Sequence, residues 1–240
     1  MSVSGSGELL GEAPGRALAV YAHPDDPEVS CGGTLAHWVR AGADVRLVVV
    51  NAGDKGSHEV GADPAALTTQ RTGEVHAAAE VLGLTGVDLL GLPDGEVTND
   101  LALRGRLVEL VRAHRPDMVI CPDPTAVFFG DTYVNHRDHR EVGWAVVDAV
   151  APAAGSPLYF PETGPPHQVA TLLLSGTFEP DVWVDISDAV DLKIAAVQCH
   201  ESRVGNDPAL VGELLRTRTA ESGGQVGVGH AEGFRRLRFA

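Results

Sequence analysis

Short apolar runs alternate along the chain with longer segments of mixed polarity. The predominantly apolar runs lie at residues 18–22, 45–50, 87–90, 118–121, 169–174 and 182–184. Runs of this length without polar alternation are typical of strands that are buried on both faces of a sheet. They predict a central sheet that is covered on both sides.

The segments between these runs carry a helical pattern of apolar positions. The predicted helices are 34–40, 69–82, 101–114, 139–150, 189–200 and 208–222. Helices that alternate with buried strands form parallel βαβ units. We therefore predict an α/β protein with a single-domain, Rossmann-like three-layer fold and a mostly parallel central sheet. Residues 16–240 form the domain, and residues 1–15, rich in Ser, Gly and Glu, are expected to be a flexible tail.

Charge and composition narrow the classes of partner. The chain has 18 basic and 33 acidic residues, a formal net charge of −15, which opposes binding to nucleic acid or to anionic lipid. Its apolar runs are too short to cross a bilayer, so we expect no membrane insertion. The three cysteines are scattered and suggest no disulfide framework, which fits a cytoplasmic protein. The sequence is compatible with a homo-oligomer.

A polar tetrapeptide, His23-Pro24-Asp25-Asp26, follows the first predicted strand directly. In an open α/β sheet, ligands bind beyond the carboxyl ends of the strands. Two adjacent carboxylates at such a position repel each other unless a cation lies nearby. An ordinary turn, with Asp as a helix cap, is the alternative interpretation of this motif alone.

A second cluster, His136-Arg137-Asp138-His139, stands where a long loop, 122–135, leads into a helix. His136 and His139 are spaced by about one helical turn and can face one crevice. A solvated helix start is the alternative. Together the two clusters offer two histidines and a carboxylate with further acidic and imidazole groups beside them, which is the composition of a catalytic metal site.

These residues resemble the LmbE-like, or PIG-L, family of metal-dependent N-acetylglucosaminyl deacetylases. The strongest matches, within residues 16–140, are Ala22-His-Pro-Asp-Asp26, Gly32-Gly33-Thr34, Gly53-Asp-Lys-Gly56, Gly91-Leu-Pro-Asp-Gly95 and His136-x-Asp-His139. Looser matches are Arg71-x-x-Glu74, Asp185-Ile-Ser187 and the segment from Lys193 to Ser202. The resemblance covers nearly the whole chain after the tail.

The resemblance implies a set of metal ligands. These are His23, Asp26 and His139. The ligand types suit Zn²⁺, and Fe²⁺, Mn²⁺ or Co²⁺ are the other candidates. The chain departs from the family at one point, because many members carry an acid directly after the second Asp, whereas this chain has Pro27 there and the acid at Glu28.

The resemblance also implies catalytic roles for neighbouring residues. Asp25 is expected to be the general base, His136 to stabilise the oxyanion or protonate the amine, and Asp138 to hold the His136 ring as a cation. Either Asp25 or His136 is chemically competent to protonate the departing nitrogen.

Contacts with the substrate are expected from Arg71, Asp94 and His200, again by resemblance. Each has an alternative explanation in local structure. Arg71 has Glu74 three residues ahead as an ion-pair partner, Asp94 stands in a Pro-Asp-Gly turn, and His200 stands near a helix C-terminus.

The expected activity is removal of an N-acetyl group from an N-acetylated amino sugar or sugar conjugate, a small-molecule substrate. An amidase acting on a thiol or sugar conjugate is an alternative within the same family. A non-haem iron oxygenase also uses two histidines and one carboxylate, although it does not require Asp25 beside the ligand Asp26. A non-catalytic domain with a structural ion is a third alternative.

A dinucleotide-binding enzyme is disfavoured, since no Gly-x-Gly-x-x-Gly motif follows the first predicted strand.

Overall fold

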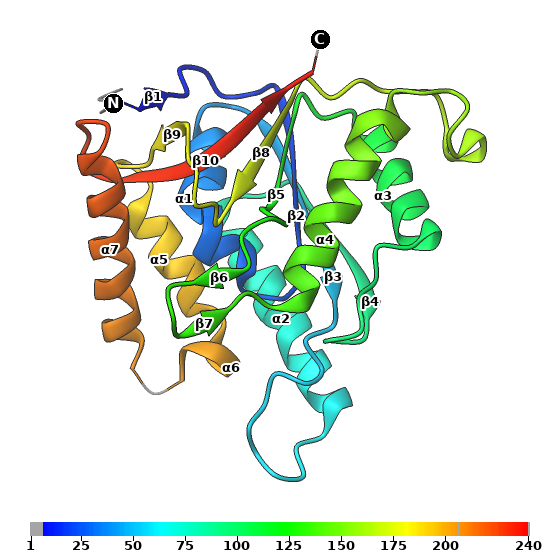
Figure 1. Ribbon diagram of the computed structural model, residues 1–240. Helices are drawn as coiled ribbons and strands as arrows, with labels where there is room; N and C mark the ends of the chain where they lie inside the picture. Colours follow the sequence, from blue (N-terminus) through cyan, green and yellow to red (C-terminus); the bar gives the residue numbers. More distant parts are fainter. Residues whose placement is uncertain (1–6, 206, 240) are drawn as a thin grey trace.

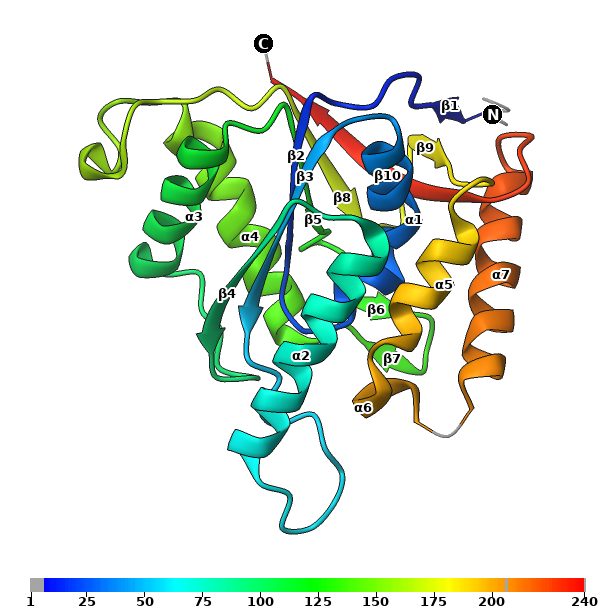
Figure 2. The same ribbon diagram turned by 180° about the vertical axis from the view of Figure 1, so that it is seen from behind.

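The protein has one large sheet with helices on both faces (Figures 1 and 2). The computed structural model describes residues 7–205 and 207–239. The strand order in the sheet is β1-β9-β10-β8-β5-β2-β3-β4. Its strands are β1 (Glu8–Leu9), β2 (Arg16–Tyr21), β3 (Asp44–Asn51), β4 (Gly86–Leu92), β5 (Met118–Pro122), β8 (Thr171–Ser175), β9 (Val182–Asp185) and β10 (Ala231–Arg238). All neighbouring strands are parallel except β10, which is antiparallel to β8 and β9.

The helices form the two outer layers. They are α1 (Asp26–Arg40), α2 (Pro64–Leu82), α3 (Leu101–His114), α4 (Arg137–Asp148), α5 (Val190–Gln198), α6 (Glu201–Val204) and α7 (Pro208–Gly224). Alternate residues of β2, β3, β5 and β8 enter separate cores: Val119 of β5 packs with α3 and α4, whereas Ile120 packs with α1, α2 and α5. This two-sided burial explains the predominantly apolar runs and confirms the predicted three-layer fold.

Strand β10 was not predicted. Its sequence, Ala-Glu-Gly-Phe-Arg-Arg-Leu-Arg, shows little apolar character, but Phe234 is fully buried and the strand lies between β8 and β9. The prediction of a flexible tail at residues 1–15 is wrong for β1, because Glu8–Leu9 pair with Val182–Trp183 of β9. Residues 1–6 lie outside the described residues.

Helix α1 starts at Asp26, rather than at residue 34 as predicted, and is interrupted at Cys31, where φ is −146°. The break leaves backbone carbonyls of the first segment without helical partners. Lys193 of α5 satisfies two of them, because its Nζ donates to the carbonyl oxygens of Glu28 and Val29 at 2.9 and 2.7 Å. The same ammonium pairs at 2.6 Å with Glu232 of β10. Two elements that are distant in the sequence, α5 and β10, thus hold the start of α1.

The long loop expected at 122–135 contains a small hairpin, β6 (Phe128–Phe129) and β7 (Tyr133–Val134). It leads directly into α4. Among the described helices, none has the length and apolar character that crossing a membrane requires.

Candidate active site

Both polar clusters predicted from the sequence meet at the carboxyl edge of the sheet. The first follows β2 and opens α1, and the second opens α4. They share the wall of a cavity of about 880 Å³, which also receives residues from α2, the β6–β7 hairpin, α6 and α7. This is the position at which open α/β sheets bind ligands.

The three predicted metal ligands converge on one point. His23 Nδ1 lies 3.0 Å from Asp26 Oδ2 and 3.0 Å from His139 Nε2, and the last two atoms are 3.1 Å apart. A tetrahedral zinc ion with bonds of about 2.0 Å separates its ligand atoms by about 3.3 Å. The donor types and spacing therefore fit such an ion. With three protein donors on an open cavity, the arrangement is that of a catalytic rather than a structural site.

Each ligand histidine has its other ring nitrogen in a hydrogen bond. His23 Nε2 lies 3.1 Å from Asp94 Oδ1, and His139 Nδ1 lies 2.7 Å from the side-chain oxygen of Asn135. Asn135 is fixed in turn by its amide, which donates to the carbonyl oxygen of Ala126 at 2.7 Å. Such contacts set the tautomer and the orientation of metal-binding imidazoles. Asn135 was not identified from the sequence.

The carboxylates make the site favourable for positive charge. Burial by itself would lower the pKa of His23, but its hydrogen bonds to Asp26 and Asp94 raise that pKa to about 10. Burial would raise the pKa of Asp26, but His139 and His23 hold it well below its usual range. The geometry thus stabilises a cation between these side chains, whether a proton or a metal ion.

Asp25 lies next to the three predicted ligands, and its side chain makes no hydrogen bond to the backbone of α1. It occupies the N-cap position of α1, but makes no capping hydrogen bond and has a left-handed backbone with φ of 95°. Burial and the neighbouring Asp26 charge raise the pKa of Asp25 to about 6. Arg203 of α6 opposes this shift, and its Nε lies 3.4 Å from Asp25 Oδ2. Asp25 is a carboxylate with raised basicity on the cavity wall.

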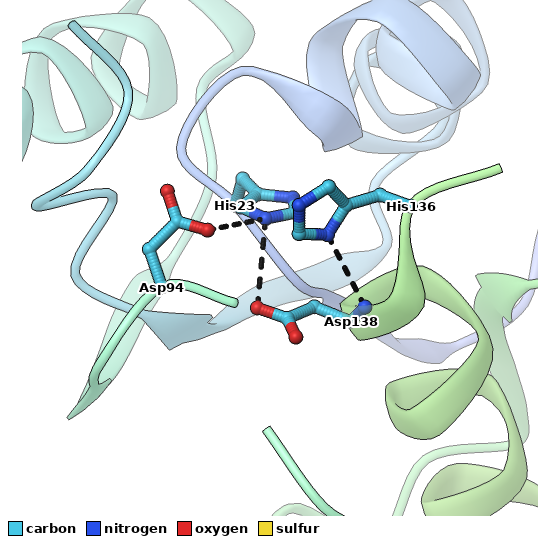
Figure 3. Close-up of side chains that lie close together, drawn as sticks. All are labelled: His23, Asp94, His136 and Asp138. Atoms are coloured by element: carbon cyan, nitrogen blue, oxygen red, sulfur yellow. Dashed lines mark hydrogen bonds and ion pairs between the residues drawn. The ribbon is translucent and has the colours of Figure 1, made fainter. Parts of the chain in front are cut away.

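The contact expected between the Asp138 carboxylate and the His136 ring is replaced by a different one (Figure 3). Asp138 Oδ2 accepts hydrogen bonds from Gly95 N and Asn51 Nδ2 at 2.7 and 3.0 Å and lies 3.7 Å from His23 Nε2. The backbone N–H of Asp138, not its carboxylate, donates to His136 Nδ1 at 3.2 Å.

Because burial and the nearby His23 lower the pKa of His136, its ring is not held as a cation. The backbone donation to Nδ1 instead selects the neutral tautomer with hydrogen on Nε2. Asp138 is buried beneath this arrangement and orders the ring of His23, the Pro-Asp-Gly turn and the end of β3.

Of the three residues expected to contact substrate, two line the cavity. Arg71 is 2% exposed and does not pair with Glu74, whose carboxylate accepts from Gln70 and Ser202 instead. Its guanidinium lies against the loop at Gly53 and Gly56 and makes one long hydrogen bond, 3.5 Å, to the Gly56 carbonyl.

Asp94 also lines the cavity, with its carboxylate directed to His23 (Figure 3). His200 does not reach the cavity wall. It is 1% exposed and its Nε2 lies 3.1 Å from Glu28 Oε2, which is the delayed acid of the first motif. The expected contact of His200 with a substrate is therefore replaced by a buried ion pair behind Asp25.

Four cavity residues had no signal in the sequence that separated them from surface residues: Phe129, Tyr133, Arg203 and Arg218. They belong to a hairpin, a short helix and the outermost helix, elements that approach the site only through the tertiary fold.

Comparison with known proteins places the chain in one family. Residues 18–150 match the model of the PIG-L family, described as GlcNAc-PI de-N-acetylase. Diacetylchitobiose deacetylase from Thermococcus kodakarensis is 31% identical over 92% of this chain and 82% of its own length. The 1D-myo-inositol 2-acetamido-2-deoxy-alpha-D-glucopyranoside deacetylase 2 of Saccharopolyspora erythraea is 35% identical over 79% of this chain and 84% of its own.

Among solved structures, N,N'-diacetylchitobiose deacetylase from Pyrococcus horikoshii, in complex with its inhibitor MPG, superposes with a TM-score of 0.85. It is 28% identical and the match covers 94% of this chain and 84% of that one. The matched segment of the family model contains both polar clusters that form the cavity wall. With its fold, its motifs and its nearly full-length relatives in agreement, this chain belongs to the PIG-L, or LmbE-like, family.

Proposed function

We propose that the protein is a metal-dependent N-deacetylase that hydrolyses the acetamide of an N-acetylated amino sugar or sugar conjugate. The observation that carries the proposal is the convergence of His23, Asp26 and His139 beside the basic carboxylate Asp25 on one cavity wall. The relatives named as deacetylases of acetylated sugars support the substrate class.

The proposed metal ligands are His23 Nδ1, Asp26 Oδ2 and His139 Nε2, and Zn²⁺ is the ion we expect, with Fe²⁺, Mn²⁺ and Co²⁺ as alternatives. When bound, such an ion supplies Lewis acidity to water and to the acetamide oxygen. Asp94 and Asn135 hold the two imidazoles in the required tautomers.

Asp25 acts as the general base in this proposal. A carboxylate with a pKa of about 6 is ionised at neutral pH but far more basic than an ordinary aspartate, so it suits removal of a proton from the attacking water. Once protonated, Asp25 is also the acid that returns the proton to the departing nitrogen. His136 is less suited to that step, since its lowered pKa favours the neutral ring.

His136 is assigned to the developing oxyanion. Its Nδ1 accepts from the backbone of Asp138, so a neutral ring presents its Nε2–H as a donor. A fixed neutral donor stabilises negative charge on the carbonyl oxygen without being consumed as an acid, and one such donor is worth roughly a hundredfold to a thousandfold in rate. Asp138 is then a positioning residue.

The direct test measures acetate released by the purified protein from N,N'-diacetylchitobiose and from an inositol-linked acetamido sugar, with and without a chelator. We expect release that the chelator abolishes and added Zn²⁺ restores. Oxygen consumption dependent on iron, with no acetate, would instead support the oxygenase alternative.

The first prediction concerns Asp25→Asn. This change removes the base but leaves the three metal donors in place, so we expect a loss of about 10²–10⁴-fold in kcat with unchanged metal content. Asp131→Asn, at an exposed position of the neighbouring loop, is the matched control and should behave as wild type. A D25N protein with wild-type turnover would contradict the assignment.

A further inference from the structure

Helix α1 consists of two segments that meet at Cys31. The first segment, residues 26–30, begins with Asp26 and follows directly on Asp25, so it carries one proposed ligand and adjoins the proposed general base. Isolated helices shorter than about 12–15 residues are marginal in water, because the first turn is costly to form. The position of this short segment is therefore set by contacts with other parts of the fold.

The second segment, residues 32–40, is anchored in the core. Its Leu35 and Trp38 are 0% and 1% exposed. In an unbroken helix, backbone hydrogen bonds from each N–H to the carbonyl four residues earlier would tie the first segment to this anchored one. At Cys31 the backbone leaves the helical conformation, with φ of −146°, and part of that tie is lost. Side chains from elsewhere must bridge the break.

Lys193 of α5 holds the end of the first segment. Its Nζ donates to the carbonyl oxygens of Glu28 and Val29 at 2.9 and 2.7 Å. These carbonyls lie at the C-terminal end of the segment, where unpaired carbonyl groups and the helix dipole both favour a cation. The Lys193 side chain is 2% exposed, so water hardly competes for these contacts.

Glu232 of β10 holds the start of the second segment. Its carboxylate accepts hydrogen bonds from the backbone N–H groups of Gly33 and Thr34 at 3.2 and 2.7 Å, and from the Thr34 hydroxyl at 2.6 Å. An anion is favourable there, because the first N–H groups of a helical segment have no partner within it. Lys193 Nζ lies 2.6 Å from Glu232 Oε1, so the ion pair joins the two segments across the break.

We propose that Lys193 and Glu232 are positioning residues for the active site, which hold Asp25 and Asp26 at the correct distance from the two ligand histidines. Those histidines reach the site on the loop after β2 and on α4, so only the first segment of α1 depends on the ion pair. Both positioning residues lie outside the cavity wall and act through the backbone of α1. The inference rests on the proposed function, since it concerns the base and a metal donor of that site.

The test removes the bridge and keeps the fold. In Lys193→Met/Glu232→Gln protein both charges are replaced together by neutral side chains of similar size, because loss of one partner alone would leave a buried charge unpaired. We expect a wild-type circular dichroism spectrum and Zn²⁺ binding at least about tenfold weaker, as when groups that orient metal ligands are removed. At saturating Zn²⁺, kcat should fall about tenfold or more with KM nearly unchanged, since the base is displaced.

Arg112→Met is the matched control. Arg112 is also a buried cation, 3% exposed, that donates to backbone carbonyls, among them those of Ala153 and Ser156 at 3.0 and 2.7 Å. The segment that it holds lies at the end of the molecule opposite to the start of α1 (Figure 1). R112M is expected to lower the urea midpoint and leave Zn²⁺ affinity unchanged. If both variants weaken Zn²⁺ binding equally, affinity merely follows stability and the proposal is overturned.

Glu232→Gln alone is the milder second variant, which decides the question if the double variant does not fold. It retains the size of the side chain and an acceptor for Thr34, and Lys193 keeps its two carbonyl partners. We expect Zn²⁺ affinity to fall roughly threefold, the difference between a charged and a neutral hydrogen-bond acceptor. Wild-type affinity in a folded E232Q protein would also overturn the proposal.

Hydrogen exchange in the metal-free protein separates this inference from the proposed function. The amide of Val29 donates to the Asp25 carbonyl oxygen at 3.1 Å and reports on the first segment. Relative to the amides of β3, its exchange should be on the order of tenfold faster in the double variant and unchanged in R112M.

Faster exchange in the double variant, with no acetate released by the wild-type protein, would support the positioning role and contradict the deacetylase. Acetate release by the wild-type protein, with unchanged Zn²⁺ affinity and exchange in the double variant, would support the deacetylase and contradict the positioning role.

Discussion

Some residues of the site were identifiable from sequence motifs, whereas the roles of others depend on contacts made in the folded protein. His23, Asp25, Asp26 and His139 belong to short motifs at a strand end and a helix start, so their chemistry was visible in the sequence. Asn135, Asn51 and Arg203 act through contacts that the tertiary fold creates. An isolated Asn in a loop has many structural explanations, and no local pattern distinguished these residues beforehand.

Asn135 provides a prediction at this scale. Asn135→Ala removes the acceptor at His139 Nδ1, 2.7 Å away, and frees the ring to adopt the other tautomer. Loss of such a partner typically weakens metal binding about 10–100-fold. Competition with a coloured chelator measures the affinity. Thr132→Ala, exposed on the same hairpin loop, is the control. An unchanged zinc affinity in N135A would show that Asn135 does not order the ligand.

At the scale of elements, the most informative feature is helix α1, which carries two site residues on a short segment before its break at Cys31. The second segment packs so closely that a Cβ built on Gly33 would lie 2.5 Å from Ile186 Cδ1. Gly33, the second glycine of the Gly-Gly pair, is explained by this approach to the residue that follows β9. The packing of α1 on Ile186 therefore fixes where the metal motif stands.

Gly33→Ala is accordingly expected to lower the free energy of unfolding by about 1–3 kcal/mol, as overpacking does. Urea denaturation measures the change. Gly73→Ala, at an exposed site of α2 with open space around it, is the matched control and should be stabilising by about 0.5–1 kcal/mol.

Ile186→Val removes the closest methyl group, so G33A and I186V together should cost less than the sum of the single changes, with a coupling of about 1 kcal/mol. Additive single effects would exclude the steric explanation.

For the whole molecule, the ion is predicted to add to stability because the ligands come from α1, α4 and the β2 loop. Added Zn²⁺ at about 100 times its Kd stabilises the native state by about 2.7 kcal/mol. For a domain of this size that corresponds to a rise of about 5–10 °C in Tm. Asp26→Asn should abolish the rise and Asp131→Asn should retain it. If added Zn²⁺ leaves the Tm of the wild-type protein unchanged, the three-ligand site is contradicted.

The architecture was largely predictable because strands that are buried on both faces produce predominantly apolar runs, and six strands were predicted at positions that the structure confirms. β10 was not, since three of its eight residues are arginines whose ion pairs lie at the sheet margin. The loop hairpin and the kink of α1 were also missed, as both depend on contacts with distant segments rather than on local pattern.

The placement of β10 has a consequence for how the chain acquires its structure. This strand, at residues 231–238, joins β9 to β8 in the interior of the sheet, and its Glu232 binds the ammonium that supports the start of α1. During synthesis, the β2–β5 half can pair as it emerges from the ribosome, but β9 is joined to the β8 side of the sheet only when β10 follows. The start of the active-site helix is thus secured only after Glu232 has been translated. Catalytic competence should therefore appear only once β10 has left the ribosome.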